Sequence, residues 1–131
     1  MVDEEARAYI VLSRSLLAQG KTEAAQAAVK SAGTLAAKSA ELGMRIHAAV
    51  VAAELHALLG YKAEAARTLN TAIAQARKAG YVSLEFDVRL ALGMVEMKSG
   101  NREAGLAALE ALEKEAKARG FGLIARKASA A

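Results

Sequence analysis

The stretch from residue 83 to residue 99 shows most clearly how hydrophobic and polar positions alternate along this chain. Its apolar residues recur at intervals of three and four in two series, which are Leu84, Val88, Ala91 and Val95, and Phe86, Leu90, Met94 and Met97. This spacing is typical of an α-helix, and two apolar stripes predict a helix that packs against two partners. The remaining face holds Glu85, Arg89 and Glu96, and Glu85 and Arg89 stand at the i, i+4 spacing that favours an ion pair.

Glycine residues divide the chain at a regular period. One series, with a period of 40 residues, follows apolar helical stretches and consists of Gly20, Gly60 and Gly100. A second series ends the stretches in between and consists of Gly43, Gly80 and Gly120. Glycine just past a helix end adopts the left-handed backbone conformation without a steric penalty, so we interpret each of these residues as a helix stop. Two interleaved glycine series at one period predict a repeating unit of two helices.

These signals predict six long helices and a short C-terminal one. The long helices are expected at residues 3–19, 22–42, 45–59, 62–79, 83–99 and 102–119. Taken in pairs they give three repeat units, followed by a C-terminal capping helix, at residues 3–42, 45–79, 83–119 and 121–131. Each pair can bury its apolar stripes only against its neighbours. We therefore predict a single all-α domain over residues 1–131, built as a right-handed stack of helix-turn-helix pairs.

The residues at these places resemble the tetratricopeptide repeat (TPR) family over about residues 6–119. That family has a Leu-Gly pair in the first helix of each unit, a glycine in the turn and small residues in the second helix. The matching positions are Tyr9, Leu12 and Leu16, then Gly60, Glu64, Ala65, Leu69 and Ala72, then Leu92, Gly93, Gly100, Glu103 and Ala104. The units here are longer than the family's standard unit of about 34 residues, and no proline closes them. The resemblance therefore implies a TPR-like α-α superhelix of the long-helix bacterial type.

The resemblance also implies a non-catalytic module that binds a protein or peptide partner. In TPR arrays the first helix of each unit lines a concave groove that receives an extended peptide or a partner helix. By the alignment above, the groove residues are Arg7, Ile10, Arg14, Leu17, His47, Val50, Glu54, Asp87, Leu90 and Met94. Ordinary surface and packing between helices is the alternative interpretation of these positions. Units of this length are similar to repeats in bacterial signalling and regulatory proteins, so the chain could also be a fragment of a larger protein of that kind.

Composition supports the helical prediction and argues against several kinds of chemistry. The chain of 131 residues contains 34 alanines, no proline and no cysteine. Alanine is the strongest helix former, and its small side chain requires closely approaching helices. Without cysteine there is no disulfide, thiol nucleophile or cysteine-based zinc site. His47 and His56 fall on different faces of one predicted helix, and the isolated glycines form no phosphate-binding loop. We therefore expect no catalytic site, no metal site and no cofactor.

The net charge of +4 at pH 7 raises the question of nucleic-acid binding. Cations are frequent between residues 98 and 127, but most lie at helix ends or opposite acidic residues, and no aromatic residues are interleaved for base stacking. We therefore expect no nucleic-acid partner. The acidic start of the chain does not resemble a signal peptide, and no apolar run is long enough to span a membrane. A cytoplasmic protein is expected.

A second functional hypothesis comes from the ends of the predicted stack. Alanine-rich terminal helices without polar caps would expose an apolar patch, which monomers rarely tolerate. The alternative to partner binding is therefore a self-association or spacer domain that forms a homodimer through its terminal helices.

Overall fold

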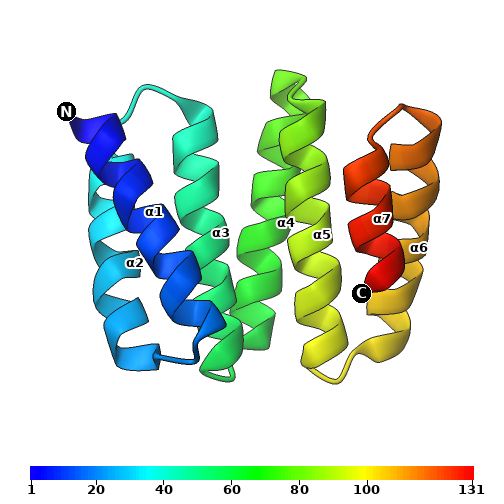
Figure 1. Cartoon of the computed structure of the whole chain (residues 1–131), viewed down its shortest axis with the longest axis horizontal. Helices are drawn as coiled ribbons and strands as arrows, with labels where there is room; N and C mark the ends of the chain where they lie inside the picture. Colours follow the sequence, from blue (N-terminus) through cyan, green and yellow to red (C-terminus); the bar gives the residue numbers. More distant parts are fainter. The chain divides into compact units, whose positions relative to one another are not determined.

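Seven α-helices joined by short turns make up the computed structural model, which describes residues 1–131 (Figure 1). They are α1 (Val2–Ala18), α2 (Thr22–Ala36), α3 (Leu42–Leu58), α4 (Lys62–Ala79), α5 (Val82–Lys98), α6 (Arg102–Ala118) and α7 (Gly122–Ala130). Five of the connections contain a glycine with positive φ, at Gly20, Gly60, Gly80, Gly100 and Gly120. The predicted all-α class and the helix-turn-helix arrangement are confirmed.

The turn at Gly60 shows how glycine ends a helix in this chain. Its φ is 91°, in the left-handed region that a side chain makes unfavourable. The Gly60 N–H donates to the carbonyl of Ala57 at 3.1 Å, and the Tyr61 N–H donates to the carbonyl of His56 at 2.8 Å. This pair of bonds is the Schellman motif, which satisfies carbonyl groups that the helix end leaves without intrahelical partners.

The connection between α2 and α3 differs from the prediction. α2 ends at Ala36 instead of residue 42, and α3 begins at Leu42, so Gly43 lies inside α3 and does not end a helix. A nearly buried Ser39 occupies the turn: its Oγ accepts a hydrogen bond from the Glu41 N–H at 3.1 Å. Its carbonyl accepts one from Arg45 Nη1 at 2.6 Å. Such side-chain bonds to the backbone compete with helix formation, so this helix ends without a left-handed glycine.

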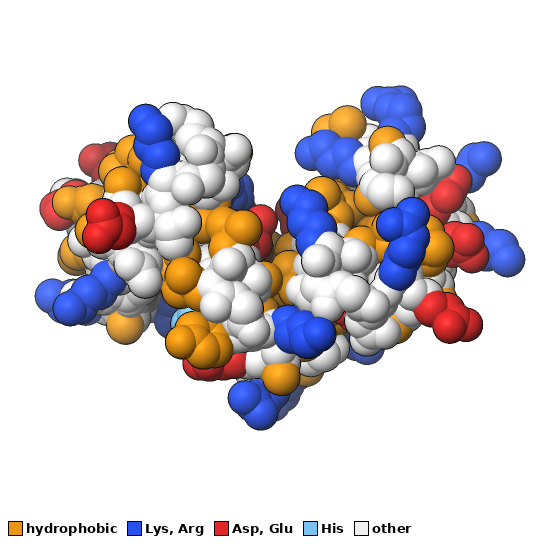
Figure 2. Space-filling view, turned by 90° about the horizontal axis from the view of Figure 1, so that it is seen from below, with side chains coloured by type: hydrophobic (Ala, Val, Ile, Leu, Met, Phe, Trp, Pro, Cys, Tyr) orange, Lys and Arg blue, Asp and Glu red, His pale blue; other side chains and the backbone are white.

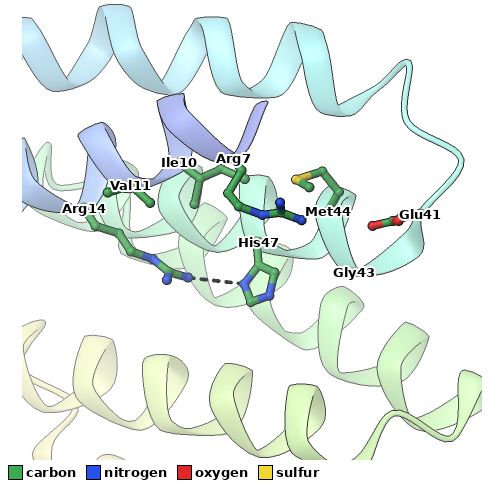
Figure 3. Close-up of a pocket in the computed structure, with 8 residues that line it drawn as sticks. All are labelled: Arg7, Ile10, Val11, Arg14, Glu41, Gly43, Met44 and His47. Carbon is green, nitrogen blue, oxygen red and sulfur yellow. Dashed lines mark hydrogen bonds between the residues drawn. The ribbon is translucent and has the colours of Figure 1, made fainter. Parts of the chain in front are cut away.

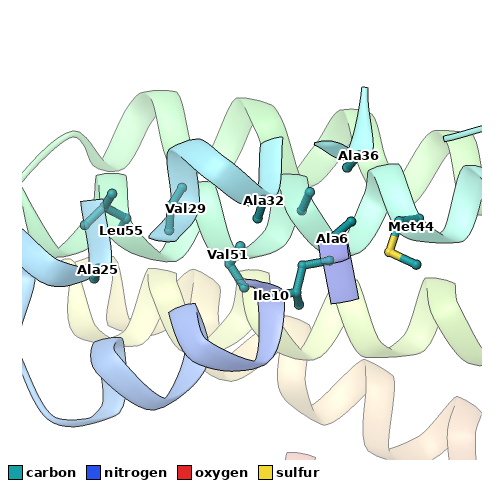
Figure 4. Close-up of a cluster of buried hydrophobic side chains, with 10 residues drawn as sticks. Ala6, Ile10, Ala25, Val29, Ala32, Ala36, Met44, Val51 and Leu55 are labelled. Atoms are coloured by element: carbon teal, nitrogen blue, oxygen red, sulfur yellow. The ribbon is translucent and has the colours of Figure 1, made fainter. Parts of the chain in front are cut away.

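The chain divides into two compact units, Met1–Ala65 and Ala66–Ala131, and each has its own core. The core of the first unit joins α1, α2 and α3 through Ala6, Ile10, Ala25, Val29, Ala32, Ala36, Met44, Ala48, Val51 and Leu55 (Figure 4). Half of these residues are alanines, so the helices meet with little side-chain volume between them. The expected single stack over residues 1–131 stays a prediction.

The core of the second unit is built around Phe86. The buried cluster joins α5, α6 and α7 through Phe86, Leu109, Leu112, Ala116, Ile124, Ala125 and Ala128. The ring of Phe121 meets the ring of Phe86 edge to face, with centroids 5.2 Å apart, a favoured aromatic geometry. α7 therefore covers an apolar face of α6.

Two glycines allow α5 and α6 to approach closely in this unit. A Cβ atom at Gly93 would lie 2.6 Å from Cδ2 of Leu109, and one at Gly105 would lie 2.8 Å from the backbone nitrogen of Met97. Both distances are shorter than a normal van der Waals contact. Gly93, part of the Leu-Gly pair noted in the sequence, therefore leaves room for the side chain of Leu109, whereas Gly105 lies directly against backbone atoms of α5.

Candidate functional site

A pocket of about 420 Å³ lies between α1 and α3 in the first unit (Figure 3). Its lining residues are Arg7, Ile10, Val11, Arg14, Glu41, Gly43, Met44 and His47. The structure thus brings together four of the predicted groove residues, Arg7, Ile10, Arg14 and His47. The pocket also contains residues that the sequence analysis did not single out, among them Met44.

The floor and the rim of this pocket differ in chemistry. Ile10 and Met44 are 4% and 5% exposed and belong to the core of the first unit. Arg7 and Arg14 are exposed and stand seven residues apart, so both side chains project from the same side of α1. The result is an apolar floor with two guanidinium groups above it. This arrangement suits a partner segment that offers an apolar side chain together with carbonyl or carboxylate oxygens.

A hydrogen bond across the pocket joins its two helices. Arg14 Nη2 and His47 Nδ1 are 3.3 Å apart, as drawn in Figure 3. A guanidinium can only donate hydrogen bonds, so His47 Nδ1 must accept this one. In the neutral imidazole the ring proton then lies on Nε2.

Charges around the pocket are mixed in sign. Glu41, which is exposed in the turn before α3, adds a carboxylate to a pocket lining that also holds two arginines. Basic, acidic and hydrophobic side chains are likewise interspersed on the molecular face shown in Figure 2. A site of this kind favours a partner that has both apolar and polar groups over one that is uniformly acidic.

The remaining predicted groove residues differ in their exposure. On α1 and α3, Leu17 is half-buried against the core of the first unit, Val50 is 7% exposed, and Glu54 is half-buried. On α5 in the second unit, Asp87 is exposed and Met94 is 37% exposed, whereas Leu90 packs against the cluster around Phe86. Leu17, Val50 and Leu90 therefore contribute to packing between helices.

The Glu85–Arg89 pair expected from the i, i+4 spacing is part of a larger ion-pair network in the second unit. Glu85 Oε2 accepts a hydrogen bond from Arg77 Nη2 at 2.9 Å and lies 3.5 Å from Arg89 Nη1. Arg89 Nη1 also donates to Glu115 Oε2 at 2.6 Å. The network links α4, α5 and α6, and Arg89 additionally lies over the ring of Phe86, 5.5 Å from its centroid. Such a guanidinium contributes a cation–π contact as well as ion pairs.

Glu85 is only 6% exposed although it lies on the polar face of α5. Its pair with Arg89 follows from spacing within α5, but its hydrogen bond from Arg77 could not be predicted because Arg77 belongs to the preceding helix. Hydrogen bonding to Glu85 raises the pKa of Arg77 above its ordinary value. Hydrogen bonding to Arg89 lowers the pKa of the Glu115 carboxyl below its ordinary value. The fixed charges therefore hold both groups in their ionised forms.

The structure gathers no group of three or more His, Cys, Asp or Glu side chains able to hold a metal ion. His47 lies at the pocket, whereas the ring of His56 meets that of Tyr61 edge to face at 6.4 Å. None of the helices is both long enough and apolar enough to cross a membrane.

In a comparison with protein families, the model of the tetratricopeptide repeat matches residues 6–30 and 46–71. The first matched segment covers most of α1 and the first part of α2, and the second covers most of α3 and the first part of α4. No curated protein and no solved structure matches the chain significantly.

Proposed function

Because residues 6–30 and 46–71 match the tetratricopeptide repeat, we propose that the chain is a TPR-like helical repeat protein and acts as a non-catalytic protein-interaction module. TPR repeats generally mediate protein–protein interactions, and repeat stacks offer extended surfaces for them. The first helices of the repeats, α1, α3 and α5, would supply the contacts. The bound partner would be a peptide segment or a helix.

The pocket between α1 and α3 is the observation that supports this proposal. Its apolar floor at Ile10 and Met44 would receive one apolar side chain of the partner. Arg7 and Arg14 would donate hydrogen bonds to oxygen atoms on either side of that anchor. Charged hydrogen bonds of this kind fix the orientation of a ligand, whereas burial of the anchor contributes affinity.

Further contacts would come from the remaining first-helix positions. In the first unit these are Leu17, Val50 and Glu54, of which Val50 would act mainly by supporting the helices from within. In the second unit, Asp87, Leu90 and Met94 of α5 would supply one carboxylate and two apolar groups. Met94 is the most adaptable of these contacts because its side chain is unbranched and flexible.

Selection from a random peptide library displayed on phage tests this function without a known partner. Peptides enriched on the wild-type protein are synthesised and titrated against the double variant Arg7→Glu, Arg14→Glu. The control is Lys21→Glu, Lys30→Glu, which changes the net charge equally at two exposed positions outside the pocket. We expect the pocket variant to bind about tenfold more weakly or worse, since two charged hydrogen bonds are lost. Equal affinity for both variants, or no enriched peptide, would refute the proposal.

Self-association through the terminal helices is the second candidate function, and one observation favours it. Val2, Tyr9 and Leu12 on α1 are 37%, 37% and 45% exposed, and Leu123 on α7 is 58% exposed. Light scattering over a range of concentrations decides between a monomer and a dimer. A strictly monomeric species at all concentrations would exclude this function.

A further inference from the structure

α1 has a second exposed surface, on the flank opposite Arg7 and Arg14. Val2, Tyr9 and Leu12 lie along it at helical spacing, each at least 37% exposed. Glu5 lies among them with its side chain 62% exposed, and its Oε1 is 3.8 Å from the exposed N-terminal ammonium of Met1. We call the surface formed by Val2, Glu5, Tyr9 and Leu12 the α1 edge.

The equivalent position on α3 and on α5 contacts the segment that comes before the helix. α1, α3 and α5 each contain 17 residues in the same register, so Glu5 corresponds to Arg45 and to Glu85. Arg45 donates to the carbonyl of Ser39, which lies between α2 and α3. Glu85 accepts from Arg77, which lies in the last turn of α4. At this register position the side chain therefore faces the preceding segment of the chain.

The neighbouring positions are less exposed on α5 than on α1. The residues equivalent to Val2 and Leu12, Val82 and Leu92, are both half-buried, and Val82 packs against the cluster around Phe86. Glu85 is 6% exposed, whereas the side chain of Glu5 is 62% exposed. The α1 edge thus has the apolar and acidic groups of a helix-to-helix contact, but it is open to solvent.

We propose that the α1 edge is a docking surface for an amphipathic helix of a partner protein. That helix packs apolar residues against Val2, Tyr9 and Leu12 and places an arginine or lysine of its last turn beside Glu5. α4 is the template for this partner, because its last-turn Arg77 pairs with the equivalent carboxylate, Glu85, at 2.9 Å. The surface is separate from the pocket between α1 and α3.

A second copy of this chain is a poorer occupant than a different protein. The helix that corresponds to α4 one repeat later is α6, which has Lys117 at the position of Arg77. An apolar face of α6 is already covered by α7, in the cluster of Leu112, Ala116, Ile124, Ala125 and Ala128. α6 would have to release α7 before it could cover the α1 edge of another copy.

A synthetic peptide with the sequence of residues 62–79 serves as the probe, because it is the template helix. The peptide is labelled with fluorescein and titrated with the full chain while its anisotropy is recorded. A second peptide has the substitution Arg77→Glu. The protein is tested as wild type, as Glu5→Arg and as Glu4→Arg, a matched control because Glu4 is an exposed neighbour on a different face of the helix.

The wild type and Glu4→Arg are expected to bind the first peptide equally. Glu5→Arg is expected to bind it about three- to fivefold more weakly, the effect of losing one partly exposed ion pair, and to prefer the second peptide. The double variant Tyr9→Ala, Leu12→Ala should bind neither peptide. Thermal melting followed by circular dichroism checks that each variant is folded.

Three results would overturn the proposal. One is the absence of binding of either peptide to the wild type. Another is an affinity for the two peptides that does not depend on the charge at position 5. The third is a wild-type dimer in light scattering that Glu5→Arg dissociates, which would assign the α1 edge to a second copy of the chain.

Discussion

Substitution of Gly105 by alanine tests the close approach of α5 and α6. Gly105 lies in the first part of α6, and a Cβ atom there would lie 2.8 Å from the backbone nitrogen of Met97 and 3.0 Å from the carbonyl oxygen of Gly93. Backbone atoms cannot rotate away as the end of a side chain can. The added methyl group therefore requires the two helices to move apart.

Two opposing terms set the size of the effect. Alanine is favoured over glycine inside a helix by about 1 kcal/mol. Overpacking against atoms that cannot yield costs up to about 3 kcal/mol. We therefore expect Gly105→Ala to lower the free energy of unfolding by about 2 kcal/mol. The matched control is Gly33→Ala in α2, where a Cβ atom would meet nothing within 4 Å. This variant should be more stable than the wild type by about 0.5–1 kcal/mol.

Thermal and urea denaturation followed by circular dichroism measure both variants. For a chain of this length, 1 kcal/mol shifts the melting temperature by about 2–5 °C, so the opposite signs are easily resolved. A Gly105→Ala variant as stable as the wild type would refute the close-approach argument. A destabilised Gly33→Ala variant would contradict the claim that alanine is favoured over glycine at an open position of α2.

Three further perturbations test the turns and the ion-pair network. Gly60→Val should lower stability by about 1–2 kcal/mol, because valine is strained at a φ of 91°; an unchanged melting temperature would contradict the assigned turn. Glu85→Gln should cost about 2 kcal/mol, the value of a buried charged hydrogen bond, whereas Glu110→Gln on the exposed face of α6 should cost almost nothing; similar melting temperatures for the two variants would argue against the network. The depressed pKa of Glu115 stabilises the fold at pH values above the unfolded-state pKa, and this stabilisation is lost as the pH falls through the folded-state pKa. Melting temperatures between pH 7 and about pH 3 should therefore fall less steeply in Glu115→Gln than in the wild type; equal slopes would contradict the pairing with Arg89.

A helix end could be predicted from the sequence where a single residue type determines it, and could not where it depends on contacts between several residues. A left-handed turn strongly favours glycine, so the helix ends at Gly60 and Gly80 could be predicted from sequence. The turn between α2 and α3 depends on two ordinary polar residues, Ser39 and Arg45, whose hydrogen bonds are decided by three-dimensional proximity. Gly43, which the sequence predicted to end a helix, instead lies within the first turn of α3.

The same distinction applies to the candidate site. Arg7, Arg14 and His47 were predicted to share a surface because they occupy the same kind of helix in successive units, and all three line the pocket. Met44 was missed because an apolar residue near a helix start gives no signal that separates a pocket floor from a core. The pair of Glu85 with Arg89 could be predicted from spacing within α5, whereas its pair with Arg77 was missed because Arg77 lies in another helix, and a helical repeat pattern describes only one helix at a time.

The apolar and the charged side chains of the two α1 surfaces differ in whether their substitution can separate binding from folding. Ile10 and Met44 belong both to the pocket floor and to the core of the first unit, so truncating either one would weaken binding and stability together. The charged groups do not have this double role, because Arg7, Arg14 and Glu5 are all exposed. They also lie on opposite flanks of one helix, separated by its buried stripe, so their effects on two different ligands should be additive. Charge reversal on one flank is therefore the appropriate control for the other, and a substitution that abolishes both interactions indicates a disturbed α1 helix.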